Sequence, residues 1–82
     1  MYEIILAKNV EKYLDKLSSN DKARILNALG KLRVRPSAYL VRLVGEKGYK
    51  FRVGKYRLIV DLDNNQLIVL VVDVGHRKNI YK

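Results

Sequence analysis

The residues of this chain best suited to chemistry are basic, and the first group lies in the segment GYKFRVGKYR, residues 48–57. Apolar and basic side chains alternate along it, which is the period of a half-buried β-strand, so Lys50 and Arg52 would share one face. Gly54-Lys55 is expected to form a two-residue hairpin turn of type II′, which needs a positive φ at its first position. Arg52 would then stand directly opposite Arg57 in the next strand.

This register also places Lys50 opposite Ile59, so that all three cations project from one face. Like charges that oppose each other across a strand pair are destabilising. No acidic residue lies between Glu46 and Asp61 to relieve the repulsion. A row of cations at strand spacing would suit the phosphate groups of an external ligand.

The second group follows the last predicted strand, residues 67–74, and contains His76, Arg77 and Tyr81. In the expected register Val72 lies opposite Arg57. The even-numbered side of the last strand then shares the face of the cations. Two further residues would bring His76 to that face, although Gly75 could bend or bulge the strand just before it.

Each candidate also has an ordinary structural interpretation. Lys50 and Arg52 could be the polar face of a half-exposed strand. Arg57 interrupts an apolar strand, where a charge is costly unless it is paired, and Asp61 or Asp73 could be its partner. His76 could be a surface histidine, and Tyr81 could pack its ring against the first strand.

Taken together, the six candidates fit one reaction, the metal-independent attack of an RNA 2′-hydroxyl on the neighbouring phosphate. That reaction needs a base for the hydroxyl, cations for the charge growing on the phosphate oxygens, and an acid for the departing 5′ oxygen. Histidine can transfer either proton, arginine can hold two phosphate oxygens, and tyrosine can stack on a base. The sequence offers no Ser-His-Asp set, phosphate-binding loop or metal-ligand cluster. The candidates are Lys50, Arg52, Arg57, His76, Arg77 and Tyr81.

Composition bounds the class of protein. The 82 residues suffice for one small domain, residues 1–82, and 49% of them are hydrophobic with a single proline. A net charge of +9 attracts nucleic acid, acidic proteins or anionic surfaces, although it could also serve solubility.

Cysteine is absent and there is one histidine, so we expect neither a disulfide nor a structural zinc site, and no cofactor. The longest apolar runs are too short to span a membrane, and the N-terminus has no apolar signal core. The expectation is a cytoplasmic protein with no membrane partner.

The elements that must position these residues follow from periodicity. Residues 1–6 form a first strand, and Asn9 could cap a helix with an apolar stripe from Val10 to Leu17. Ser19 or Asn20 could cap a second helix that runs towards Pro36, with Ile25, Leu26, Leu29 and Leu32 as its stripe.

Residues 39–44 could be a short strand or an extended loop. Strands at 49–53, 56–62 and 67–74 follow, the last two joined by a type I′ turn at Asn64-Asn65. The predicted fold is α+β, with a helical hairpin on one face of a small, mainly antiparallel sheet in the order β-α-α-β-β-β.

Two segments carry a family resemblance, YKFRVGKYRLIV at 49–60 and GHRKNIY at 75–81. With the strand and two helices before them, they resemble the RelE toxins of prokaryotic toxin–antitoxin systems over essentially the whole chain. The resemblance implies a metal-independent endoribonuclease that cleaves mRNA in the ribosomal A site, inhibits translation and is neutralised by a RelB-like antitoxin. The toxin–antitoxin complex could also bind operator DNA.

By the same resemblance, the cations stabilise the transition state and Tyr81 orients the substrate. Arg52 stands where the best-known form has lysine and His76 where some members have lysine. Because arginine stays protonated, Lys50 is the better proton carrier of the basic pair. Two alternatives remain: a gyrase inhibitor of the ParE branch, and a non-catalytic nucleic-acid-binding module.

Overall fold

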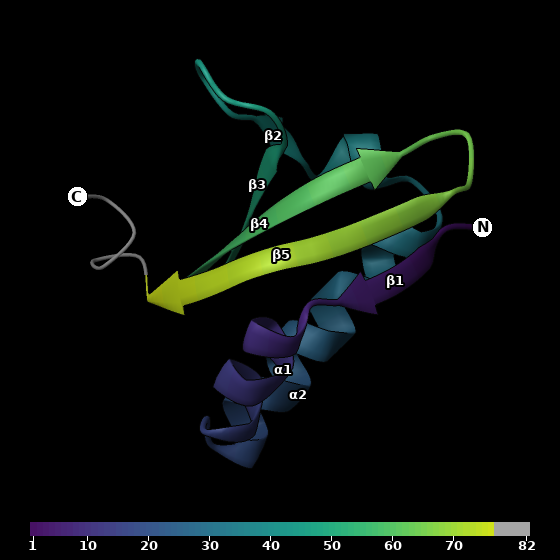
Figure 1. The fold of residues 1–82 in the computed structure, drawn as a ribbon. Helices are drawn as coiled ribbons and strands as arrows, with labels where there is room; N and C mark the ends of the chain where they lie inside the picture. The colour runs from purple at the N-terminus through teal and green to yellow at the C-terminus, as the bar shows by residue number, and fades with distance from the viewer. Residues whose placement is uncertain (77–82) are drawn as a thin grey trace.

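A five-stranded sheet and two helices make up the fold, which a computed structural model describes for residues 1–76 (Figure 1). The sheet order is β1-β5-β4-β3-β2; β1 runs parallel to β5, and the other neighbours are antiparallel. This confirms the predicted α+β class and the order of its main elements. The elements are β1 (Glu3–Leu6), α1 (Lys8–Asp15), α2 (Ser19–Gly30), two 3₁₀ turns (Lys31–Arg33 and Pro36–Ala38), β2 (Val41–Arg42), β3 (Tyr49–Val53), β4 (Tyr56–Asp63) and β5 (Ile68–His76).

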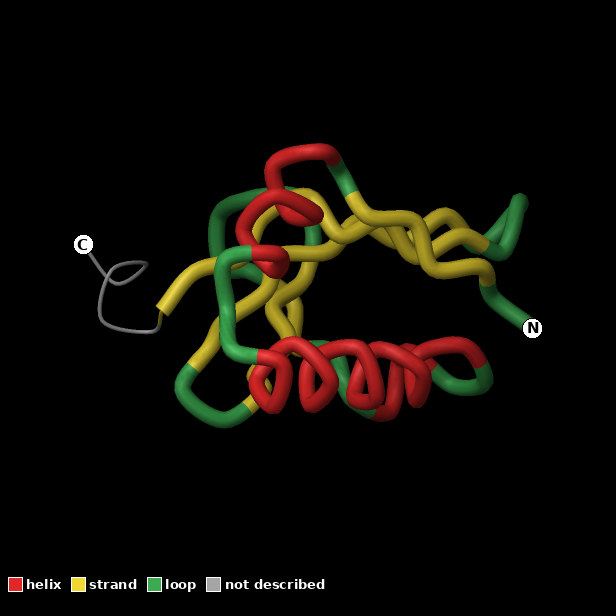
Figure 2. The backbone as a smooth tube through the Cα atoms, turned by 90° about the horizontal axis from the view of Figure 1, so that it is seen from below, coloured by secondary structure: helices red, strands yellow, loops and turns green. Residues whose placement is uncertain are grey.

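Both helices pack on the face of the sheet that carries the buried residues of the central strands, and they lie together below β5 in Figure 1. Figure 2 shows the same helices, in red, from below. The core lies between the helices and the sheet, because the apolar stripe of each helix meets the apolar side of the central strands. Leu26 departs from the predicted stripe, since its side chain is 42% exposed. The fully buried residues are Val10, Leu14, Ile25, Leu29, Leu32, Leu58, Val60, Val69 and Val71.

The helix ends differ in detail from the prediction. Ala7 is the N-cap of α1, so Asn9 lies in the first turn and does not cap the helix. Ser18 caps α2, where its hydroxyl accepts a hydrogen bond from the Asp21 N–H at 3.2 Å. The α-helix ends at Gly30, well before Pro36, and Leu32 enters the core from the 3₁₀ turn that follows.

The β3–β4 hairpin has the predicted register, with Arg52 opposite Arg57 and Lys50 opposite Ile59. Gly54, the first residue of the turn, has a φ of +56°. Among the non-glycine residues that the structure describes, Leu67 alone has a positive φ, so the φ of Lys55 is negative. A positive φ followed by a negative φ fits a type II′ turn and not a type I′ turn. Local turn chemistry thus fixes how the three cations are arranged.

The β4–β5 connection is longer than predicted, and the type I′ turn at Asn64-Asn65 is wrong. Asp63 pairs with Ile68, and the Asp63 carboxylate accepts hydrogen bonds from the N–H groups of Asn65 and Gln66. Leu67, with a φ of 57°, completes the loop. A carboxylate that binds the backbone two and three residues ahead competes with the tighter turn.

A β-bulge then shifts the register once more. Val60 pairs with Val71 but Ile59 pairs with Asp73, which leaves Val72 as the extra residue of β5. The Val72 carbonyl accepts a hydrogen bond from the Asn9 side-chain amide at 3.1 Å. This hydrogen bond ties the bulge of β5 to the first turn of α1.

Residues 39–44 resolve into an exposed turn and the two-residue strand β2, which pairs with Tyr49 and Lys50 of β3. No helix in the described part of the chain is long and apolar enough to cross a membrane.

Candidate nucleic-acid interface

The open face of the sheet carries a cavity of about 480 Å³, here called the open-face cavity. Its lining includes three of the predicted site residues, Lys50, Arg52 and Arg57, which β3 and β4 present from one face. None of its described lining residues is acidic. The lining residues are Tyr39, Val41, Lys50, Phe51, Arg52 and Arg57.

Arg57 is the buried member of the three cations, with 8% of its surface exposed, whereas Arg52 is exposed. Across the sheet, Arg57 lies between Arg52 on β3 and Gly75 on β5. Glycine places no side chain beside the guanidinium on that flank. Two adjacent guanidiniums can each bind two oxygens of a phosphate, which is the geometry that anion recognition uses.

Asp73 is the acidic residue that the register brings nearest to this group. It lies on the same face, opposite Ile59 and diagonal to Arg57. Its side chain is exposed, and one carboxylate oxygen accepts the N–H of Val74 at 2.9 Å. Of the two partners that the structural interpretation of Arg57 names, Asp61 and Asp73, the register therefore places Asp73 nearer.

His76 does not join the cations, contrary to the prediction. The bulge at Val72 turns the end of β5, so His76 pairs with Tyr56 and Arg57 faces Gly75 in place of Val72. The His76 and Tyr56 rings are 6.0 Å apart between centroids and meet edge to face. One extra residue in a strand exchanges the two faces beyond it, which is why the alternation seen in the sequence gave the wrong side.

Tyr56 anchors the helix side of this region. Its hydroxyl donates a hydrogen bond to the Asp21 carboxylate at 2.7 Å, and its ring meets Tyr13 edge to face at 6.4 Å. That hydrogen bond, followed by burial and the negative charge of Asp21, raises the pKa of Tyr56 to about 12. The contact ties the first turn of α2 to the start of β4.

Two predicted residues, Arg77 and Tyr81, lie outside the described residues. A further residue, Tyr39, was missed by the sequence reasoning although it lines the open-face cavity and is 47% exposed. Its only sequence signal was an aromatic side chain shortly after Pro36, in a segment whose secondary structure was ambiguous. Within residues 1–76, no three His, Asp or Glu side chains form a group that could hold a metal ion.

Comparison with known proteins gives the family. Residues 4–81 match the model of the ParE toxin of the type II toxin–antitoxin system parDE. A candidate toxin of Methanocaldococcus jannaschii, RelE4, is 32% identical to the chain, and the match covers all of this chain and 93% of the relative.

Solved structures agree on the fold. The toxin–antitoxin complex RelBE2 of Mycobacterium tuberculosis contains a chain that is 26% identical, with a TM-score of 0.83 over 93% of this chain and 98% of that chain. A chain of the RelE–RelB complex of Pyrococcus horikoshii is similar in fold, at 22% identity and a TM-score of 0.78 over 93% of this chain and 94% of that chain. With a family model that spans nearly its full length, this chain belongs to the RelE/ParE family of toxins of type II toxin–antitoxin systems.

Proposed function

We propose that this toxin is a ribosome-dependent endoribonuclease that cleaves mRNA in the ribosomal A site. The observation that supports this best is the grouping of Lys50, Arg52 and Arg57 around one cavity whose described lining has no acidic residue. Such a site favours a group that gains negative charge during reaction, as a phosphate under attack does.

In the proposed reaction the 2′-hydroxyl loses its proton to a base and its oxygen bonds to the adjacent phosphorus. The bond from phosphorus to the 5′ oxygen breaks, and that oxygen takes up a proton. The products are a 2′,3′-cyclic phosphate and a 5′-hydroxyl end. Arg52 and Arg57 bind the phosphate oxygens, and Arg77 is proposed to add a further cation and Tyr81 to orient the substrate.

Lys50 is the proposed proton carrier, because His76 faces the other side of the sheet and an arginine stays protonated. Lys50→Arg keeps the positive charge but removes the transferable proton. We expect the cleavage rate to fall about 10²- to 10⁴-fold, the usual contribution of a general acid or base, while RNA affinity is kept. An equal loss of cleavage rate in Lys50→Arg and Lys50→Ala, with unchanged RNA affinity in Lys50→Arg, would identify proton transfer as the role of Lys50. Full cleavage activity of Lys50→Arg would mean that Lys50 contributes only its positive charge.

The ribosome is proposed as the platform because a domain of this size has little surface with which to hold a naked strand in line. The inhibitory partner is proposed to be a RelB-like antitoxin, since related toxins were solved in complex with RelB. The complex is proposed to bind operator DNA through the two proteins together.

Primer extension on a defined messenger tests the proposal. Wild-type protein is added to programmed ribosomes and to naked RNA, and Arg57→Ala and Arg77→Ala are added to ribosomes. We expect cuts only with ribosomes, reduced at least about tenfold in either variant, the scale of one lost transition-state contact. Lys16→Ala, an exposed residue remote from the open-face cavity, is the charge control. Circular dichroism of Arg57→Ala checks that the loss of activity is not unfolding.

Gyrase inhibition is the second candidate, because the family model that matches is that of ParE. A DNA-supercoiling assay with purified gyrase separates the two. Inhibition of supercoiling without any RNA cut would favour the ParE activity, whereas salt-sensitive RNA binding with neither activity would favour a binding module.

A further inference from the structure

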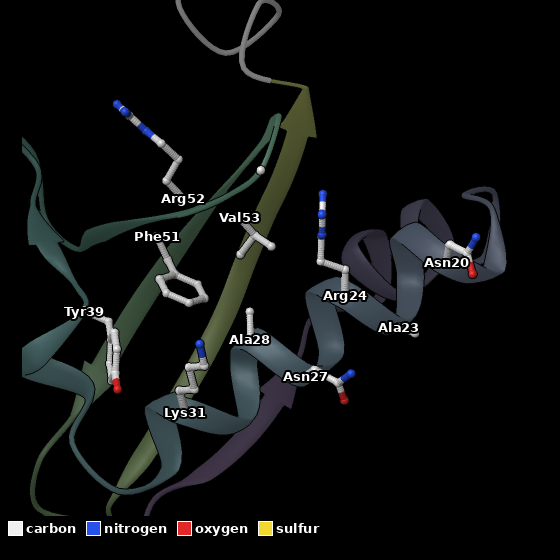
Figure 3. Close-up of a pocket in the computed structure, with 11 residues that line it drawn as sticks. Asn20, Ala23, Arg24, Asn27, Ala28, Lys31, Tyr39, Phe51, Arg52 and Val53 are labelled. Carbon is white, nitrogen blue, oxygen red and sulfur yellow. The ribbon is translucent and has the colours of Figure 1, made fainter.

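A second cavity, here called the α2 groove, separates α2 from the free edge of β3 (Figure 3). It has a volume of about 690 Å³. β2 pairs only with Tyr49 and Lys50, so the later part of β3 forms the groove wall. The lining residues are Asn20, Ala23, Arg24, Asn27, Ala28, Lys31, Tyr39, Phe51, Arg52, Val53 and Gly54.

The helix side of the groove is a polar stripe. Asn20, Arg24, Asn27 and Lys31 recur at helical spacing, so they share the face of α2 and its 3₁₀ extension that borders the groove. Figure 3 shows the Arg24 and Lys31 side chains rising from this stripe towards β3. The Arg24 guanidinium lies beside the hairpin turn, 3.2 Å from the point where a Cβ on Gly54 would stand.

The charged side chains that line the α2 groove are all positive. Arg24, Lys31 and Arg52 are its ionised side chains among the described lining, and no aspartate or glutamate accompanies them. Tyr39 closes one end with a half-exposed ring. Cations that bind phosphates, together with an aromatic ring on which a base can stack, are the combination that single-stranded RNA sites use.

The α2 groove and the open-face cavity adjoin each other at β3, because Tyr39, Phe51 and Arg52 line both. We propose that single-stranded RNA continues from the reacting phosphate over the β3 edge into the α2 groove, where Arg24 and Lys31 bind its phosphates and Tyr39 stacks on a base. This inference rests on the proposed function, since it takes the open-face cavity as the place of the reacting phosphate. An acidic protein segment is the competing occupant.

RNA binding is measured by fluorescence anisotropy with a labelled 12-nucleotide single strand across a salt series. For single strands, the slope of log K against log salt is about −0.7 for each phosphate contact. The double variant Arg24→Ala/Lys31→Ala should therefore have a slope shallower than wild type by about 1.4. The matched control is Lys12→Ala/Lys16→Ala, which removes the same charge from exposed positions near and just after the end of α1 and should leave the slope close to wild type.

The stacking step has its own readout. Base stacking on an aromatic side chain contributes about 1–3 kcal/mol, so Tyr39→Ala should weaken RNA binding about 5- to 160-fold. Tyr39→Phe should keep wild-type affinity, because the ring and not the hydroxyl binds the base. Two results would overturn the inference. One is an equal salt slope for the groove double variant and the control double variant, and the other is an equal loss of RNA affinity in Tyr39→Ala and Tyr39→Phe.

The antitoxin gives the remaining comparison. If the groove pair weakens antitoxin binding but leaves the RNA slope unchanged, the groove is a protein-docking site and the inference is wrong. Failure of the proposed function looks different: wild-type protein would not cut mRNA on ribosomes, even though the groove variants still change the RNA slope.

Discussion

Arg57 occupies an unusual position for a cation, in the middle strand of the exposed face with another arginine directly opposite. Burying a charge costs free energy unless hydrogen bonds or counter-charges compensate, and like charges across a strand pair add to that cost. The fold keeps Arg57 mostly buried but leaves Arg52 exposed at the rim of the open-face cavity. The two arginines should therefore differ in how strongly their removal affects stability.

Arg52→Thr tests the exposed arginine at the level of a single residue. Threonine suits a strand, and surface substitutions usually change stability by no more than about 0.5 kcal/mol. We expect urea unfolding to shift within that range, while mRNA cleavage falls at least about tenfold because one phosphate contact is lost.

The control for that substitution is Arg42→Thr. Arg42 is also an exposed strand arginine, but it lies opposite Tyr49 and outside the described lining of the open-face cavity. Cleavage by Arg42→Thr should stay near wild type. A similar loss in both variants would mean that net charge, and not the position of Arg52, controls the reaction.

At the scale of elements, the sequence predicted the structure correctly where that structure depends on neighbouring residues. Alternation and the Gly54-Lys55 turn predicted the β3–β4 register residue by residue, because a two-residue loop leaves little choice of pairing. The end of β5 was beyond such reasoning. Its bulge is contacted by a side chain 63 positions away, the Asn9 amide that donates a hydrogen bond to the Val72 carbonyl. Sequence therefore found the cations of the candidate site but placed His76 on the wrong face.

Asn9→Ala should weaken the bulge. The variant removes the amide that donates a hydrogen bond to the Val72 carbonyl, and one such hydrogen bond contributes about 0.5–1.5 kcal/mol. We expect chemical denaturation to show a loss of that size. Asn27→Ala, at an exposed position of α2, should cost less and serves as the control. Unchanged stability of Asn9→Ala would show that pairing with β1 and β4 alone holds the bulge.

Tyr56 and Asp21 couple α2 to β4 in a way that depends on pH. The pKa of tyrosine is about 10 when unperturbed and about 12 here. Between these values the folded state keeps a proton that the unfolded state has released. The stabilisation is therefore complete below about pH 10 and is lost as the pH rises through about 12.

Tyr56→Phe removes this contribution, so wild type should exceed the variant in unfolding free energy at pH 8, and the gap should narrow from pH 10 to pH 12. Urea titrations of both proteins across that range measure the gap. Asp21→Asn removes the negative charge but keeps a hydrogen-bond acceptor for the Tyr56 hydroxyl. When both proteins carry Asp21→Asn, the difference in unfolding free energy between them should narrow less steeply with pH. A constant gap from pH 8 to pH 12 would contradict the assignment.

At the scale of the whole molecule, a net charge of +9 in 82 residues produces a field that extends beyond any one site. The open-face cavity and the α2 groove share a border and both present cations, so the same surface that would bind RNA would also attract an acidic inhibitor. Competition between RNA and antitoxin for one positive region would then be a direct consequence of the charge distribution, without any change in the fold.

The cognate antitoxin should therefore be acidic where it meets the toxin, and its association should be steered by charge. Electrostatic steering raises association rates by about 10- to 10³-fold and is screened by salt, whereas dissociation depends on the contacts already formed. Stopped-flow mixing of toxin and antitoxin in rising NaCl should show an association rate that falls at least about tenfold and a dissociation rate that changes far less. The control is Lys12→Gln/Lys16→Gln, which lowers net charge away from both cavities and should retain most of the salt dependence. An association rate independent of salt would mean that apolar contacts, and not the cationic surface, guide the antitoxin to the toxin.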